Sequence, residues 1–221
     1  ARLLPLPAND HIVAKHRGVS ISAGQFQQAV GYWRDRLIAE TETAVALYCH
    51  DAYPFAVWLL AAWHAGKTVW LPANNAAGTA AQLLNQSCRL LGDWPMHSDN
   101  LCADHASAAT AFSPLPPQST GVVLFTSGSA GEAKAIGKTL QQLQTEVETL
   151  QQCWGRQLGN STVLGTVSQQ HIYGLLFRVL WPLAAGRCFH SEAALSPEAL
   201  TKQAAPACWI ASPAHLKRLN E

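Results

Sequence analysis

Short apolar runs and longer stripes of helical spacing alternate along the chain, and the two kinds of segment predict different elements. The apolar, often β-branched runs predict strands at residues 19–21, 44–49, 68–71, 121–125, 162–167, 187–190 and 207–210. The segments between them predict helices at residues 26–37, 53–65, 76–86, 140–150, 173–184 and 197–203, with a last helix from Pro213. Repeated strand–helix alternation is typical of an α/β fold, in which helices flank a mostly parallel sheet.

Several helix ends carry a local signal of their own. Ser22 with Gln25, and Thr139 with Gln142, have the spacing of a capping box, in which the two side chains satisfy each other's backbone N–H groups. Gly66 stands where a glycine often ends a helix. The second capping box predicts that a helix begins at Leu140.

Composition changes this picture only a little. The chain has 221 residues, 48% of them hydrophobic, which suffices for one sizeable core or two subdomains. Prolines and small polar residues gather at 93–118, which is therefore expected to be a loop and is the candidate position of a subdomain break.

Charge and targeting signals narrow the choice of partner and compartment. A formal net charge of +1 gives no reason to expect nucleic acid or a membrane surface as partner. No apolar run of about 18 residues predicts a membrane span, and no signal core follows the N-terminus. The six cysteines form no Cys-x-x-Cys pair, which favours reduced thiols in a cytoplasmic protein.

The stretch 125–139, Phe-Thr-Ser-Gly-Ser-Ala-Gly-Glu-Ala-Lys-Ala-Ile-Gly-Lys-Thr, holds the clearest candidate chemistry. It joins an apolar strand to the capped helix at 140, so a strand–loop–helix is expected. Glycines let a ligand approach main-chain N–H groups, while hydroxyls and a lysine donate to anions. The residues expected to bind a polyphosphate are Thr126, Ser127, Gly128, Ser129, Gly131 and Lys134. A flexible exposed turn would use similar residues, but the lysine and the strand–helix setting favour phosphate.

A second pattern overlaps the first. Gly131 and Gly137-Lys138-Thr139 look like the G-x-x-x-x-G-K-[ST] loop of the phosphate-loop NTPases. Five residues separate the two glycines, where that loop has four, so Lys138 and Thr139 would be displaced from the phosphates. An NTPase remains only as an alternative.

The residues 126–134, Thr-Ser-Gly-Ser-Ala-Gly-Glu-Ala-Lys, resemble the T-S-G-[ST]-T-G-x-P-K loop of the adenylate-forming (AMP-binding) superfamily. Members include acyl-CoA synthetases, AMP-dependent acid ligases, luciferases and adenylation domains of peptide synthetases. Ala130 and Ala133 replace the usual threonine and proline. Three further stretches resemble the family in order and spacing, at 58–72, 165–175 and 207–219. The resemblance covers nearly the whole chain and identifies it as the N-terminal part of the large domain.

The resemblance also implies an activity. A carboxylic acid would be activated with ATP and Mg²⁺ to an acyl-adenylate, and the acyl group would pass to a thiol on CoA or on the phosphopantetheine arm of a carrier protein. Lys134 would be the catalytic residue. His171, with Tyr173 and Gly174, takes the place of the family's P-[LM]-[FY]-H-x-x-G motif beside the acid. An isolated histidine is more often structural, but this one follows a strand end, where open α/β sheets bind ligands.

No residue is assigned to a metal, because the other histidines show no ligand spacing and no cysteine partner. The family's aromatic-Gly-x-Thr-Glu stretch, its ribose-binding aspartate and its C-terminal lid would all follow Glu221. The chain alone is therefore not expected to complete the reaction. A non-catalytic binding or scaffold protein of the same fold remains an alternative, which Ala130 favours.

Overall fold

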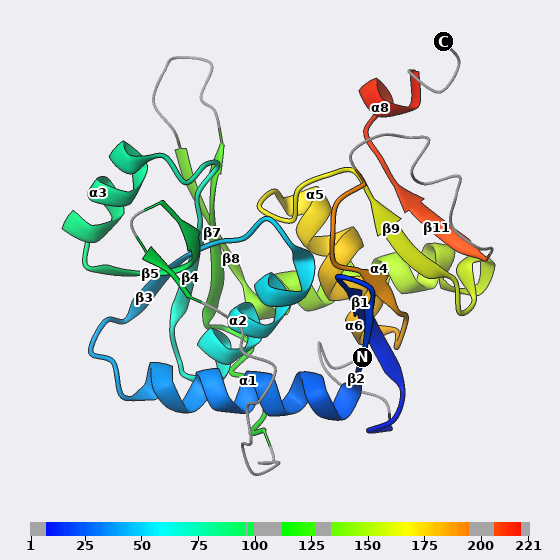
Figure 1. Ribbon diagram of the computed structural model, residues 1–221, viewed down its shortest axis with the longest axis horizontal. Helices are drawn as coiled ribbons and strands as arrows, with labels where there is room; N and C mark the ends of the chain where they lie inside the picture. The colour runs from blue at the N-terminus through cyan, green and yellow to red at the C-terminus, as the bar shows by residue number, and fades with distance from the viewer. Residues whose placement is uncertain (1–7, 96, 100–111, 127–133, 195–205, 218–221) are drawn as a thin grey trace. The chain divides into compact units, whose positions relative to one another are not determined.

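The computed structural model describes residues 8–95, 97–99, 112–126, 134–194 and 206–217 (Figure 1). The chain divides into two compact units. The first comprises Ala1–Gln25, His50–Tyr53 and Gln144–Glu221, and the second comprises Phe26–Cys49 and Pro54–Leu143. The described residues on both sides of the proline-rich segment 93–118 belong to the second unit.

The first unit contains a five-stranded sheet with the order β11-β9-β10-β1-β2. Its strands are β1 (Ile12–His16), β2 (Val19–Ser22), β9 (Thr162–Gly165), β10 (Phe189–His190) and β11 (Ala207–Ile210). β11, β9, β10 and β1 pair in parallel, and β2 returns antiparallel to β1 through a tight turn. Arg17 and Gly18 both adopt positive φ angles in this turn, which glycine tolerates well and arginine rarely adopts.

A continuous helical run packs on β9 in the first unit. It consists of α5 (Ile172–Gly174), a π-helix η1 (Leu175–Leu180) and α6 (Trp181–Ala184). The Trp181 indole donates a hydrogen bond to Gln151 Oε1 of α4 (Leu140–Leu158) at 2.8 Å. Arg187 donates to the same Oε1 atom and to the carbonyls of Gly155 and Gly159, so it fastens the end of α4 to the segment before β10. A short helix, α8 (Pro213–Lys217), follows β11.

The second unit contains a six-stranded sheet with the order β6-β5-β3-β4-β7-β8. Its strands are β3 (Ala44–Tyr48), β4 (Thr68–Leu71), β5 (Cys88–Trp94), β6 (His97–Ser98), β7 (Thr120–Thr126) and β8 (Lys134–Thr139). The four central strands are parallel, while β6 and β8 pair antiparallel at the two edges. The central strands β3 and β4 are apolar on both faces, as expected for a sheet covered by helices.

Three helices contribute to the core of the second unit. They are α1 (Ala23–Ile38), α2 (Ala52–His64) and α3 (Ala77–Asn85). Trp33 of α1 meets Trp58 of α2 edge to face, with ring centroids 5.5 Å apart. Ala80 and Leu83 of α3 pack against Leu90 and Trp94 of β5. No helix in the described part of the chain is long and apolar enough to cross a membrane.

The predicted α/β fold with mostly parallel strands is confirmed. Each predicted strand has a counterpart, and both capping boxes form reciprocal hydrogen bonds. The pattern analysis missed β1, β5, β6 and β8. The helix predicted at 197–203 lies outside the described residues.

Candidate functional site

The two ends of the glycine loop are held together by a β-hairpin in the second unit. β7 pairs antiparallel with β8, and Thr126 stands directly opposite Lys134 in the register. Ser127, Gly128, Ser129 and Gly131 lie outside the described residues. The Lys134 side chain is exposed at the start of β8. Of the predicted phosphate-binding residues, the structure thus brings Thr126 and Lys134 together.

The expectation of a strand–loop–helix is wrong in one respect. The residues after the loop form a strand, β8, before helix α4 begins at Leu140. Lys134–Thr139 contains a glycine and only two β-branched residues, so its own propensity for strand is weak. The backbone hydrogen bonds with β7 make it a strand, and this pairing is a tertiary effect that a local pattern does not reveal.

The hairpin also decides against the NTPase alternative. A phosphate-loop NTPase wraps the main-chain N–H groups of G-K-[ST] around a phosphate at the start of a helix. Here Gly137 pairs with Val123, Lys138 with Val122, and Thr139 with Thr120 in the antiparallel ladder. Extended backbone in a ladder cannot make that wrap, so the pattern that ends in Lys138 is not such a loop.

The start of β7 is anchored to two helices. The Trp63 indole of α2 donates a 2.8 Å hydrogen bond to the carbonyl oxygen of Gly121. A Cβ atom at Gly121 would lie 2.8 Å from Leu140 Cδ2 and 3.3 Å from Leu143 Cδ1, so a glycine lets α4 approach the strand closely. These contacts fix the start of β7 against α2 and α4.

The predicted acid-binding residues lie at the start of the helical run in the first unit. His171 directly precedes α5 in an extended conformation, and its carbonyl accepts a 2.8 Å hydrogen bond from Leu175 N–H. His171 and Tyr173 are both exposed, with Tyr173 at 41%. The Tyr173 hydroxyl donates to the carbonyl of Ala211 at 3.4 Å. Both side chains are therefore accessible at one helix end, where they could meet a small ligand.

Gly174 has a packing role. A Cβ atom there would lie 2.0 Å from Ser168 O and 2.5 Å from Ser168 C, which no side chain can occupy. The first helical turn thus lies directly on the preceding loop. The φ angle of Gly174 is −67°, so close approach, not backbone freedom, is what demands glycine.

A buried polar network, which the sequence analysis missed, supports this loop. Arg178 is 1% exposed, and it donates to Val167 O at 2.6 Å, to Gln169 Oε1 at 3.1 Å and to Ser191 O at 3.1 Å. The Gln169 amide donates in turn to His50 O. Gln169 and Gln170 are buried, so they belong to the support of the loop and not to an exposed pocket wall.

Burial also changes two pKa values in this region. Partial burial raises the pKa of the Tyr173 hydroxyl, and Cys208 makes a smaller contribution in the same direction. Burial lowers the pKa of Arg178 to about 10, against the opposing fields of Asp51 and Glu192. Arg178 therefore remains a cation at neutral pH.

Comparison with known proteins decides the family. The sequence model described as "AMP-binding enzyme" matches residues 71–221, about two thirds of the chain. The chain belongs to the AMP-binding enzyme family. This membership confirms the resemblance seen in the glycine loop, which lies within the matched region. A search of curated proteins found no significant match.

Solved structures of this family share the fold. ATP-bound MatB from Rhodopseudomonas palustris superposes with a TM-score of 0.77 at 20% identity, over 97% of this chain and 48% of that chain. A malonyl-CoA ligase with methylmalonyl-CoA and AMP bound gives 0.72 at 20% identity, over 89% and 45%. The N-terminal subdomain of NpsA from Klebsiella oxytoca, in complex with 3-hydroxyanthranilyl-AMSN, gives 0.64 at 16% identity, over 88% and 53%. The chain spans about half the length of these structures.

Proposed function

We propose that this chain supplies the polyphosphate loop of an enzyme that activates a carboxylic acid with ATP. The acid becomes an acyl-adenylate with release of pyrophosphate, and the acyl group then passes to a thiol. The observation that carries the proposal is the segment 126–134: it has the glycines, hydroxyls and lysine of the family's loop, and its two ends pair across the β7–β8 hairpin.

Lys134 is the residue proposed to act on the reacting phosphates. An ammonium group at the mouth of a glycine-rich loop stabilises negative charge that grows on the leaving pyrophosphate. Gly128 and Gly131 allow main-chain N–H groups to approach the phosphate oxygens, and Ser127 and Ser129 add hydroxyl donors. Magnesium neutralises part of the phosphate charge when it is bound, and no residue of this chain is assigned to it.

His171 and Tyr173 are the residues proposed to border the carboxylic acid, with Gly174 fixing the helix end beneath them. Their exposure and their shared position at the start of α5 support this assignment. The acid is expected to be small, and its acceptor is either CoA or the phosphopantetheine arm of a carrier protein. The malonyl-CoA ligase neighbour holds methylmalonyl-CoA with AMP, which supports CoA as one of the two acceptors.

The activity is proposed for a protein that also carries the family's remaining stretches, and not for residues 1–221 alone. The solved neighbours are about twice as long as this chain. A cytoplasmic location is part of the proposal, since the cysteines have no disulfide-type spacing.

ATP–pyrophosphate exchange against a panel of carboxylic acids tests the proposal. Exchange that requires one of the acids supports an adenylate-forming ligase. Phosphate release without any acid would point to an NTPase. If a longer version of the protein binds ATP but gives no exchange with any acid, the proposal is wrong and the scaffold alternative holds.

A further inference from the structure

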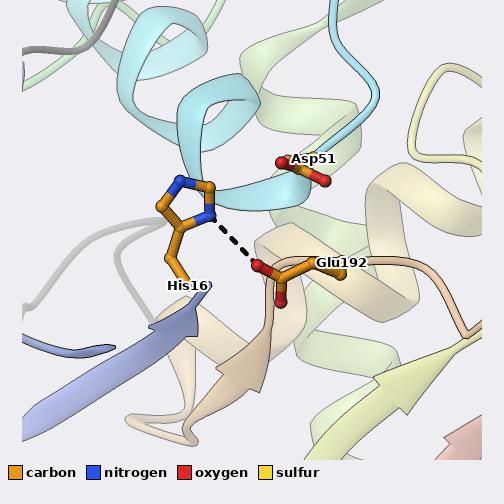
Figure 2. A group of neighbouring side chains, drawn as sticks. All are labelled: His16, Asp51 and Glu192. Atoms are coloured by element: carbon orange, nitrogen blue, oxygen red, sulfur yellow. Dashed lines mark ion pairs between the residues drawn. The ribbon is translucent and has the colours of Figure 1, made fainter. Parts of the chain in front are cut away.

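Three side chains from distant parts of the sequence converge in the first unit. His16 ends β1, Asp51 directly precedes α2, and Glu192 follows β10 by two residues. One imidazole nitrogen and one oxygen from each carboxylate all lie within 4.8 Å of one another. Figure 2 shows the imidazole and both carboxylates turned toward a common space between the three segments. The side chains of His16 and Asp51 are 18% and 19% exposed, and that of Glu192 is 43% exposed.

Backbone hydrogen bonds around Ser191 fix the three segments. β1 and β10 are parallel, so both strands end at the same edge of the sheet, where Ser191 N–H donates to Lys15 O at 2.9 Å. Ala52 N–H donates to Ser191 O at 2.8 Å, and Tyr53 N–H donates to Ser191 Oγ at 3.0 Å. The start of α2 is thus tied to the end of β10. The cluster is held in place before any ligand arrives, as binding sites usually are.

The His16 imidazole lies beside a carboxylate and a hydroxyl group. Burial lowers the pKa of the His16 imidazole, against the fields of Glu192 and Asp51, which raise it. The Nδ1 atom of His16 lies 3.5 Å from Glu192 Oε1 and 2.9 Å from Ser191 Oγ.

Two arginines provide the competing explanation, a network of ion pairs. Arg17 Nη2 lies 3.3 Å from Asp51 Oδ2, and its main-chain N–H bonds to Glu192. The Arg17 side chain is 76% exposed, so its ion pair with Asp51 is weak and easily exchanged. Arg178 is hydrogen-bonded to uncharged groups and acts on the carboxylates only through its field.

We propose that His16, Asp51 and Glu192 bind one divalent transition-metal ion, with Zn²⁺ as the preferred ion. One imidazole nitrogen and two carboxylate oxygens form a donor set that Zn²⁺ accepts, and a water would fill a fourth position. Bonds of about 2.0–2.2 Å require the three donors to close in by roughly 1 Å, a distance that side-chain rotation covers. The ion would replace the exposed Arg17 guanidinium at Asp51 and join β1, β10 and the start of α2. This site is independent of the acid-activating function.

Metal titration of the protein tests the site. Isothermal titration with Zn²⁺ is expected to show one strong site per chain. His16→Ala, Asp51→Asn and Glu192→Gln should each weaken it at least tenfold. His11→Ala is the matched histidine control, since His11 lies just before β1 and bonds to Gly186 O. Glu148→Gln is the carboxylate control on α4. Control variants that lose affinity as much as the cluster variants, or cluster variants that keep it, would overturn the proposal.

Co²⁺ provides a readout that does not depend on any variant folding. The structure has free cysteines, among them the exposed Cys153, and thiolates also bind these metals. Bound Co²⁺ is expected to show visible absorption without a thiolate charge-transfer band. In NMR spectra of the wild-type protein with Zn²⁺, the His16 ring resonances should shift while those of His11 stay. A thiolate band, or unmoved His16 resonances, assigns the metal elsewhere and contradicts the site.

Arg17→Ala separates the metal site from the ion-pair network. If the guanidinium competes with the ion for Asp51, then its removal should tighten Zn²⁺ binding several-fold. Unchanged or weaker Zn²⁺ binding in this variant would show that the arginine and the ion do not compete for the Asp51 carboxylate. That result would contradict the proposal.

Discussion

At Gly174, the absence of a Cβ atom lets the start of the helical run pack directly on the loop before it. Its missing Cβ leaves room for Ser168 O, and an added methyl group would stand 2.0 Å from that oxygen. We expect Gly174→Ala to lower the free energy of unfolding by about 3 kcal/mol or more, because the helical run and the loop 168–170 would have to separate. Urea denaturation followed by circular dichroism measures this.

A second helical glycine gives the matched control. Gly78 of α3 is exposed and has no atom within 4 Å of its would-be Cβ. Gly78→Ala should raise stability by roughly 0.5–1 kcal/mol, because alanine loses less backbone entropy in a helix. Equal effects at both positions would contradict the packing account of Gly174.

His64 should gain its proton at a much lower pH than an ordinary histidine. Burial, with a smaller contribution from Arg34, lowers its pKa to about 4, and its ring lies 4.6 Å from the ring of Phe112. The unfolded chain takes up this proton near the ordinary value of 6.5, so between pH 6.5 and 4 the unfolded state binds more protons. The stability that neutral His64 contributes is therefore present above pH 6.5 and is lost as the pH falls toward 4.

Two measurements check this assignment. As the pH falls from 6.5 toward 4, the wild type should lose unfolding free energy relative to the His64→Gln variant, because the variant has no imidazole to protonate. An NMR titration should find the His64 ring still neutral at pH 5. A midpoint near 6.5 in the folded protein would show that the ring is solvated.

At the scale of elements, helix α4 begins with the capping box of Thr139 and Gln142, which the sequence predicts. Gln142 N–H donates to Thr139 Oγ1 at 3.2 Å, and Thr139 N–H donates to Gln142 Oε1 at 2.9 Å. Thr139→Ala should lower the free energy of unfolding by about 1 kcal/mol. Thr149→Ala, at an exposed position in the middle of the same helix, removes only a hydrogen bond to Thr145 O and should be neutral or slightly stabilising. A cap variant as stable as the wild type would contradict the role of the capping box.

Elements with local signals were predictable, and those fixed by distant partners were not. The two capping boxes, the buried helix α2 and the apolar strands β3, β4 and β7 are all visible in sequence. β8 is not, because its backbone is extended only through its ladder with β7. Likewise the π-helix at Leu175–Leu180 keeps the apolar spacing of a helix and differs only in hydrogen bonds.

At the scale of the whole molecule, the candidate phosphate loop was predictable because its residues are contiguous. The His16, Asp51 and Glu192 cluster was not, since 35 and 141 positions separate its members. The parallel pairing of β1 with β10 brings two of them to one sheet edge, and Ser191 ties the third. Arg178 was missed for a similar reason: its partners lie on separate loops.

The central claim, that the loop from Thr126 to Lys134 holds the phosphates of ATP, is tested most directly by comparing two lysines of one strand. Lys134 begins β8 at the loop, and Lys138 lies four residues along the same strand, opposite Val122. In acid-dependent ATP–pyrophosphate exchange by a longer version of the protein, Lys134→Ala should reduce the rate at least a hundredfold. Lys138→Ala should stay within about threefold of the wild type, as expected for a strand residue outside the site. Unchanged exchange in Lys134→Ala, or a greater loss in Lys138→Ala, would contradict the account.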